Sequence, residues 1–251
     1  MKFENTQVMN FEGAIRGMRN PKNSWDKSDS HHNGNGILKG HFVIGEKDLE
    51  LMQTLIKAGS EHRKFMRQIF VSVDITAPLY WWKEFDTYKV GTVSNSCSTM
   101  HKLASTPITM DCFEMDDFAD VNVATVIMNK RLSLNTSTFY ELILIPYLER
   151  IRQKNNELVE NAKYLSEIKE FDEAKKARDL AVNYWKELIR ILPESWLQKR
   201  TITMNYENLL AMCSKGQRRF HKLTEWSNSF IGWARTLPYA QELLFLDEFV
   251  K

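Results

Sequence analysis

The chain has 251 residues, of which 43% are hydrophobic and 26% charged. This composition is typical of a globular protein with a sizeable core, and we expect a single domain over residues 1–251. The formal net charge of +2 argues against a polymer of nucleic acid as partner, which needs a strongly basic face. The sequence has no run of about 18 apolar residues, so we expect no membrane span. No apolar stretch near Met1 resembles a signal peptide. We expect a cytoplasmic protein.

The first part of the chain predicts a loop followed by a helix. Residues 20–36 are rich in Asn, Ser, Asp and Gly, which is typical of a long loop. His31 and His32 lie within it, but no further ligand stands at a suitable spacing, so we interpret them as loop surface and expect no metal site. Apolar residues then share one face of a predicted helix over Glu46–Ala58, with Gly59 as its stop.

A strand follows this helix. Aliphatic side chains alternate with other residues over 69–76, which predicts a strand with one buried face. Ala77-Pro78 is expected to end it. The aliphatic positions are Ile69, Val71, Val73 and Ile75.

The rest of the chain is dominated by helical spacing. Residues 104–138 have weak periodicity, but from Thr138 onward apolar stripes and charged faces predict a long helical excursion over about residues 139–192, ended by Pro193. Asn205 is the predicted N-cap of a helix that runs through Cys213. A last stripe is interpreted as core or as an oligomer interface; it consists of Leu223, Trp226, Phe230, Trp233 and Leu237. The expected fold class is α+β, with a mixed or antiparallel sheet braced by helices.

Short motifs accompany this order of elements. Thr87-Tyr88-Lys89-Val90-Gly91-Thr92 follows Ala77-Pro78, and Ser94–His101 comes next. Further on stand Arg190-Ile191-Leu192-Pro193, Thr203-Met204-Asn205 and Arg218-Arg219-Phe220-His221.

These motifs and their order resemble the flavin-dependent thymidylate synthases over residues 46–102 and 185–240. That family has an R-H-R-x-x-S signature and an N-E-x-S-x-R-Y stretch at the first two places. It then has R-x-x-L-P, T-x-N and a late Arg followed by His. Here Thr87-Tyr88-Lys89-x-x-Thr92 replaces the signature, so the chain resembles a divergent member that lacks it. Glu207 stands where the family often has Arg, which brings a negative charge near the expected flavin phosphate.

The resemblance implies a flavoprotein of nucleotide biosynthesis. Its expected reaction is that of an FAD-dependent methyltransferase: methylation of dUMP, or a related pyrimidine nucleotide, from methylenetetrahydrofolate, with FAD as hydride carrier and NADPH as a further co-substrate. A homotetramer is also implied. The catalytic positions implied are Arg218 and Arg219. The substrate-binding positions implied are Glu84, Ser98 and Arg190. The cofactor-binding positions implied are Tyr88, Lys89, Asn205 and His221.

Other interpretations of the same residues stay open. Arg190 sits in the last turn of a predicted helix, where the helix dipole favours any cation by about 0.3–1 kcal/mol. Residues 215–222 could form a solvated basic turn, or the contact surface of a nucleic-acid-binding helical protein, although the near-neutral charge argues against the latter. The main alternative is a non-catalytic nucleotide-binding or scaffold protein that kept the fold and lost the reaction.

Overall fold

The structure is a computed structural model that describes residues 1–34, 40–98, 103–115, 123–127 and 130–248. The chain divides into two compact units. The first consists of Met1–Thr76, Trp81–Asn95 and Lys199–Lys251, and the second of Ala77–Tyr80 and Ser96–Gln198. The single domain expected over residues 1–251 stays a prediction.

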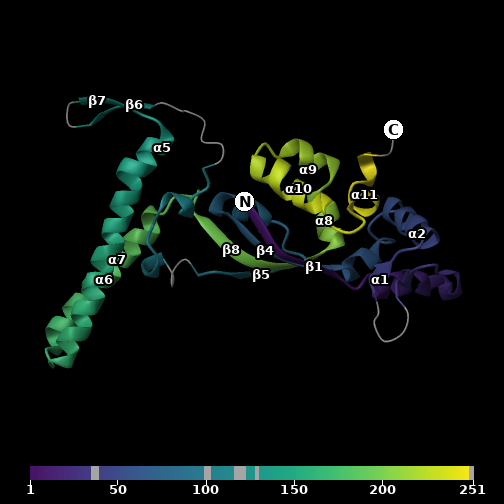
Figure 1. Cartoon of the computed structure of the whole chain (residues 1–251), viewed down its shortest axis with the longest axis horizontal. Helices are drawn as coiled ribbons and strands as arrows, with labels where there is room; N and C mark the ends of the chain where they lie inside the picture. The colour runs from purple at the N-terminus through teal and green to yellow at the C-terminus, as the bar shows by residue number, and fades with distance from the viewer. Residues whose placement is uncertain (35–39, 99–102, 116–122, 128–129, 249–251) are drawn as a thin grey trace. The chain divides into compact units, whose positions relative to one another are not determined.

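Most of a four-stranded sheet belongs to the first unit. Its strand order is β1-β4-β8-β5 (Figure 1). β1 runs antiparallel to β4, with Lys2 opposite Thr76 and Met9 opposite Phe70. The bounds are β1 Lys2–Met9, β4 Phe70–Pro78, β5 Val93–Ser96 and β8 Leu197–Asn205. This sheet, together with the helices below, confirms the predicted α+β fold class.

β4 confirms the predicted strand and its buried face. Its aliphatic residues, with Ile69 just before it, are at most 1% exposed. The opposite face is polar: Asp74 accepts hydrogen bonds from Asn5 Nδ2 at 2.9 Å and from Thr201 Oγ1 at 2.6 Å. The sheet therefore has one apolar and one polar face, as the alternation in sequence requires.

The first unit also contains short helices. The predicted helix after the long loop is confirmed as α2, and Gly59 after it has the left-handed φ of 104° typical of a helix stop. The 3₁₀ and π segments that matter below are η1 (Asn20–Lys22), η2 (Trp25–Lys27), η3 (Lys64–Gln68) and η7 (Glu225–Phe230). The α-helices are α1 (Phe11–Arg19), α2 (Glu46–Lys57), α3 (Leu79–Phe85), α8 (Tyr206–Met212), α9 (Lys215–Phe220), α10 (Ile231–Arg235) and α11 (Ala240–Leu243).

The long loop expected over residues 20–36 contains η1, η2 and a short strand. His31 and His32 form β2 (His31–His32), which pairs with β3 (Phe42–Val43). Further on, the aromatic stripe at η7 and α10 is core: Trp226 and Phe230 are fully buried, whereas Leu223 is 40% exposed.

The second unit confirms the predicted helical excursion. α6 (Ile145–Glu167) and α7 (Phe171–Ile191) lie side by side (Figure 1). They follow α5 (Thr136–Phe139) and a π-helical turn at Tyr140–Leu144. Pro146 lies just after the π-helical turn, in a helical backbone that continues from the turn into α6, where its missing N–H removes one hydrogen bond to the preceding turn.

A β-hairpin also belongs to this unit, in a region for which no element was predicted. It consists of β6 (Val123–Ile127) and β7 (Lys130–Leu134), which pair antiparallel. Throughout the described residues, the helices are too short or too polar to cross a membrane.

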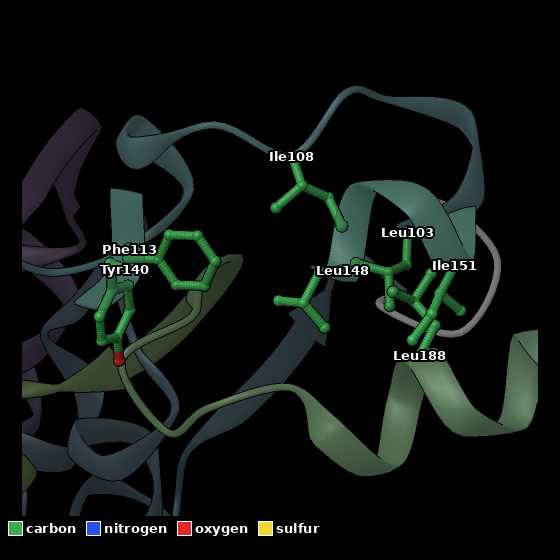
Figure 2. Packing of buried hydrophobic residues seen from close by; sticks show 7 residues of the cluster. All are labelled: Leu103, Ile108, Phe113, Tyr140, Leu148, Ile151 and Leu188. Carbon is green, nitrogen blue, oxygen red and sulfur yellow. The ribbon is translucent and has the colours of Figure 1, made fainter. Parts of the chain in front are cut away.

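The second unit has its own hydrophobic core, shown in Figure 2. Leu148 and Ile151 of α6 pack with Leu188 of α7, and both Leu148 and Leu188 are fully buried. Phe113 meets Tyr140 edge-on, with ring centroids 5.2 Å apart. The rest of the cluster consists of Leu103 and Ile108.

Candidate functional site

Three of the residues singled out from sequence meet around Trp226. The His221 ring stacks on the Trp226 ring with centroids 4.1 Å apart, and the Tyr88 ring lies 5.6 Å from it. His221 Nε2 is 3.5 Å from Glu84 Oε1. The structure therefore brings Glu84, Tyr88 and His221 together from α3, the loop after it and the end of α9.

In this cluster His221 is buried, Glu84 and Tyr88 are half-buried, and burial determines the protonation of His221 and Tyr88. Burial lowers the pKa of His221, and the Glu84 carboxylate only partly opposes this, so the imidazole is neutral at neutral pH. Burial raises the pKa of Tyr88 to about 12, so its phenol stays protonated. Among the described residues, His221 Nε2 has no hydrogen-bond partner. Tyr88 and His221 are thus uncharged beside the Glu84 carboxylate, and the cluster supplies no cation for a phosphate.

Asn205 caps α8, as predicted. Its side chain accepts a hydrogen bond from Asn208 N at 3.0 Å, and its own N–H donates to Asn208 Oδ1 at 3.2 Å. Asn208 Nδ2 in turn donates to Val90 O at 2.5 Å. Gly91 has a left-handed φ of 80°, and a Cβ there would lie 2.8 Å from Asn205 Nδ2. The start of α8 therefore fixes the loop that carries Lys89, whose side chain is exposed.

The predicted catalytic arginines differ in their surroundings. Arg218 Nη2 donates to both carboxylate oxygens of Asp247, at 2.9 and 3.0 Å, and lies 3.4 Å from Glu248. It also donates to Cys213 O. Its charge is thus offset by two carboxylates. Arg219 is exposed on α9.

The two remaining substrate-binding candidates belong to the second unit. Arg190 lies in the last turn of α7, is 72% exposed and is 3.8 Å from Glu187. Ser98 is half-buried just after β5. The end of the second predicted motif, Thr99–His101, lies outside the described residues. The roles of Arg190 and Ser98 stay predictions.

A cavity of about 540 Å³ lies beside α8 and α9 in the first unit. Its volume is within the range of about 300–1,000 Å³ that is typical of ligand sites. The apolar part is formed by Ile56, Leu210, Ala211, Leu244 and Leu246. The polar part is formed by Lys57, Arg63, Ser214, Lys215 and Asp247. Sequence reasoning missed this cavity because its walls come from three distant segments, and the one local signal is the basic stretch Glu61–Arg67 after Gly59.

The negative charge of Glu207 is compensated from that same stretch. Arg63 Nε donates to Glu207 Oε1 at 3.2 Å, and Arg67 donates to both carboxylate oxygens. Burial raises the pKa of Glu207, but the hydrogen bonds from Arg67 and Arg63 outweigh burial and hold the pKa below its usual range. Glu207 is therefore an ionised anchor that holds Arg63 at the rim of the cavity.

Comparison with known proteins adds evidence on the fold. The chain matches no protein-family model and no curated protein. It does match two crystal structures of the flavin-dependent thymidylate synthase ThyX from Helicobacter pylori, both with FAD and dUMP bound. The chain has the ThyX fold. One match has a TM-score of 0.53 at 17% identity and covers 98% of this chain and 99% of the other. The second has a TM-score of 0.54 at 17% identity and covers both chains completely.

Proposed function

We propose that this protein is a thymidylate synthase-like flavoenzyme that binds FAD and a pyrimidine nucleotide and methylates dUMP from methylenetetrahydrofolate, with NADPH as reductant. The main support is the likeness to ThyX, which extends over at least 98% of this chain and 99% of the other, in structures that hold FAD and dUMP. The sequence resemblance also supports a homotetramer, and from the composition we expect it in the cytoplasm.

The cavity beside α8 fits FAD by the chemistry of its lining. Its aliphatic residues suit a planar heteroaromatic ring, and Lys57, Arg63 and Lys215 suit the two phosphates. Arginine binds phosphate through two parallel hydrogen bonds, whereas lysine contributes a point charge. FAD, when bound, supplies the hydride transfer, and the chain's own residues supply binding, orientation and exclusion of water.

The remaining candidates have roles that follow from their surroundings. Arg219 and Lys89 are exposed cations: Arg219 is our candidate for the nucleotide phosphate and Lys89 for a flavin phosphate. Arg218 is held by Asp247 and so positions α9. Asn205 positions the Lys89 loop through the cap of α8. The protonated Tyr88 and the neutral His221 add no charge of their own to the site beside the Glu84 carboxylate.

The test is the absorbance spectrum of the purified full-length protein, with and without added FAD, together with its melting temperature with dUMP. We expect a yellow protein that dUMP stabilises. Lys215→Ala should weaken FAD binding by tens of fold, because a hydrogen bond to a charged group contributes about 1.5–3 kcal/mol. Lys163→Ala, at an exposed lysine of α6, is the matched control. A colourless protein that rejects both FAD and dUMP overturns the proposal.

A second candidate is a nucleotide-binding protein that has lost the reaction. It is favoured by Arg218, whose guanidinium is taken up by Asp247 and Glu248, and by Tyr88, which packs against Trp226 in place of a signature residue. Saturable dUMP binding by flavin-free protein, without formation of dTMP, would favour this candidate. Measured dTMP formation would eliminate it.

A further inference from the structure

A second cavity in the first unit is strongly basic. It has a volume of about 870 Å³ and lies between η1, η2, α2 and η3. Its lining includes the lysines Lys22, Lys27, Lys47 and Lys64, and among the described lining residues Glu61 is the acid. Glu61 pairs with Lys64 at 3.2 Å, and together the four lysines and the one glutamate carry a formal charge of +3.

The cavity wall that carries two of these lysines is held by a buried cation. Arg19 is 5% exposed and also lines the cavity. Its Nη1 donates to Ser24 O and its Nη2 to Lys27 O, both at 3.2 Å. Its Nε donates to Asp48 Oδ1 at 2.6 Å, which offsets its charge. Arg19 therefore fixes the backbone of the 20–27 segment and leaves binding to the lysines.

Asp48, which binds Arg19, is itself held by two serines that follow the 20–27 segment. Asp48 Oδ2 accepts hydrogen bonds from Ser28 Oγ and Ser30 Oγ, both at 2.6 Å. Asp29 accepts from Lys47 N at 3.0 Å, which ties the segment to the start of α2. These internal bonds fix the backbone of the segment that carries Lys22 and Lys27 in the absence of any ligand. Such preorganised positive charge lowers the cost of binding an anion.

The distribution of the lysines over four elements indicates the kind of anion. They come from η1, η2, α2 and η3, so they surround the cavity instead of forming one patch. Lysine ammonium groups are strongly hydrated point charges that suit phosphate oxygens spread over several atoms. We propose that this cavity binds the oligophosphate group of a small molecule. It shares no lining residue with the cavity assigned above to FAD, so this inference goes beyond the proposed function.

Calorimetric titration of the full-length protein with inorganic tripolyphosphate tests the inference, with triglutamate and orthophosphate as parallel ligands. We expect one saturable site per chain, a clear preference for tripolyphosphate, and weaker binding at higher salt. The double variant K22Q/K64Q should lose at least tenfold in affinity, while its melting temperature stays near that of the wild type because both lysines are exposed.

The control is the double variant K163Q/K176Q, at two exposed lysines of the helical excursion. It should bind tripolyphosphate as the wild type does. Any FAD bound by K22Q/K64Q should match the wild-type amount, which separates this cavity from the proposed flavin site. Absence of saturable binding, equal loss in both double variants, or tighter binding of triglutamate than of tripolyphosphate would overturn the proposal.

Discussion

Replacing Asp48 by asparagine should destabilise the first unit more than any surface substitution. Asp48 is fully buried and Arg19 is 5% exposed, with Nε and Oδ1 2.6 Å apart. Burial raises the pKa of Asp48, but hydrogen bonds from Ser28, Ser30 and Arg19 outweigh it, so the carboxyl is ionised at neutral pH. Asp48→Asn keeps the size of the side chain and removes its charge. The Arg19 guanidinium is then left without a counter-charge.

The expected cost follows from burial. Removing one partner of a buried ion pair costs about 3–5 kcal/mol, because the other charge stays desolvated. Single domains are stable by only about 5–15 kcal/mol, so this loss is a large fraction of the total. The amide of the introduced asparagine would still accept one of the serine hydrogen bonds, which places the expected loss toward the lower end of that range.

Urea unfolding followed by tryptophan fluorescence measures this loss. Glu50→Gln, an exposed neutralisation on the same helix, is the control and should change stability by less than about 0.5 kcal/mol. The double variant Arg19→Met/Asp48→Leu should recover part of the loss, since removing both charges also removes both desolvation penalties. An Asp48→Asn protein within about 1 kcal/mol of the wild type would refute the view that Arg19 depends on this carboxylate.

Further perturbations test the other parts of the molecule. The pKa of His221 is lowered from 6.5, so its contribution to stability is present above pH 6.5 and is lost as the pH falls through the folded-state pKa. The melting temperature should therefore fall between pH 7 and pH 5, and His221→Phe should make this fall smaller. Leu188→Ala should cost about 2–5 kcal/mol in urea unfolding, whereas Leu180→Ala, at a position 45% exposed, should cost little. Glu207→Gln removes the anchor that holds Arg63 at the rim of the proposed flavin cavity and should weaken FAD binding several-fold in a titration; unchanged or tighter binding would contradict that role.

Elements with a clear local period could be predicted from sequence, and the others could not. α2, β4 and the α6–α7 pair each have an apolar face at a regular spacing over many residues. β8 was missed because only Ile202 and Met204 mark its buried face before Asn205. β6 was missed because Val-Ala-Thr-Val-Ile does not alternate. Strands of this kind depend on a partner strand, which a local pattern does not encode.

The same distinction between local signals and long-range contacts applies to the candidate site. The cap at Asn205 was predictable, because an Asn before an apolar helical run is a local signal. The contacts between His221 and Glu84 and between Arg63 and Glu207 join residues more than 130 positions apart. Arg218 was expected to face a ligand, and its pairing with Asp247 became visible only in the fold. The type of a side chain is known from the sequence, but the residue that it contacts depends on long-range packing.

The irregular backbone of β1 affects whether a strand of another molecule can pair with this edge of the sheet. β1 is an outer strand, and its pairing with β4 shifts between Glu4 and Gln7, where Asn5 adopts a left-handed φ of 54°. A bulge there interrupts the row of backbone donors and acceptors that an added strand would need. Deleting Asn5 should make the edge strand β1 regular. Its exposed backbone groups would then be able to pair with a strand of another molecule, as in fibril growth.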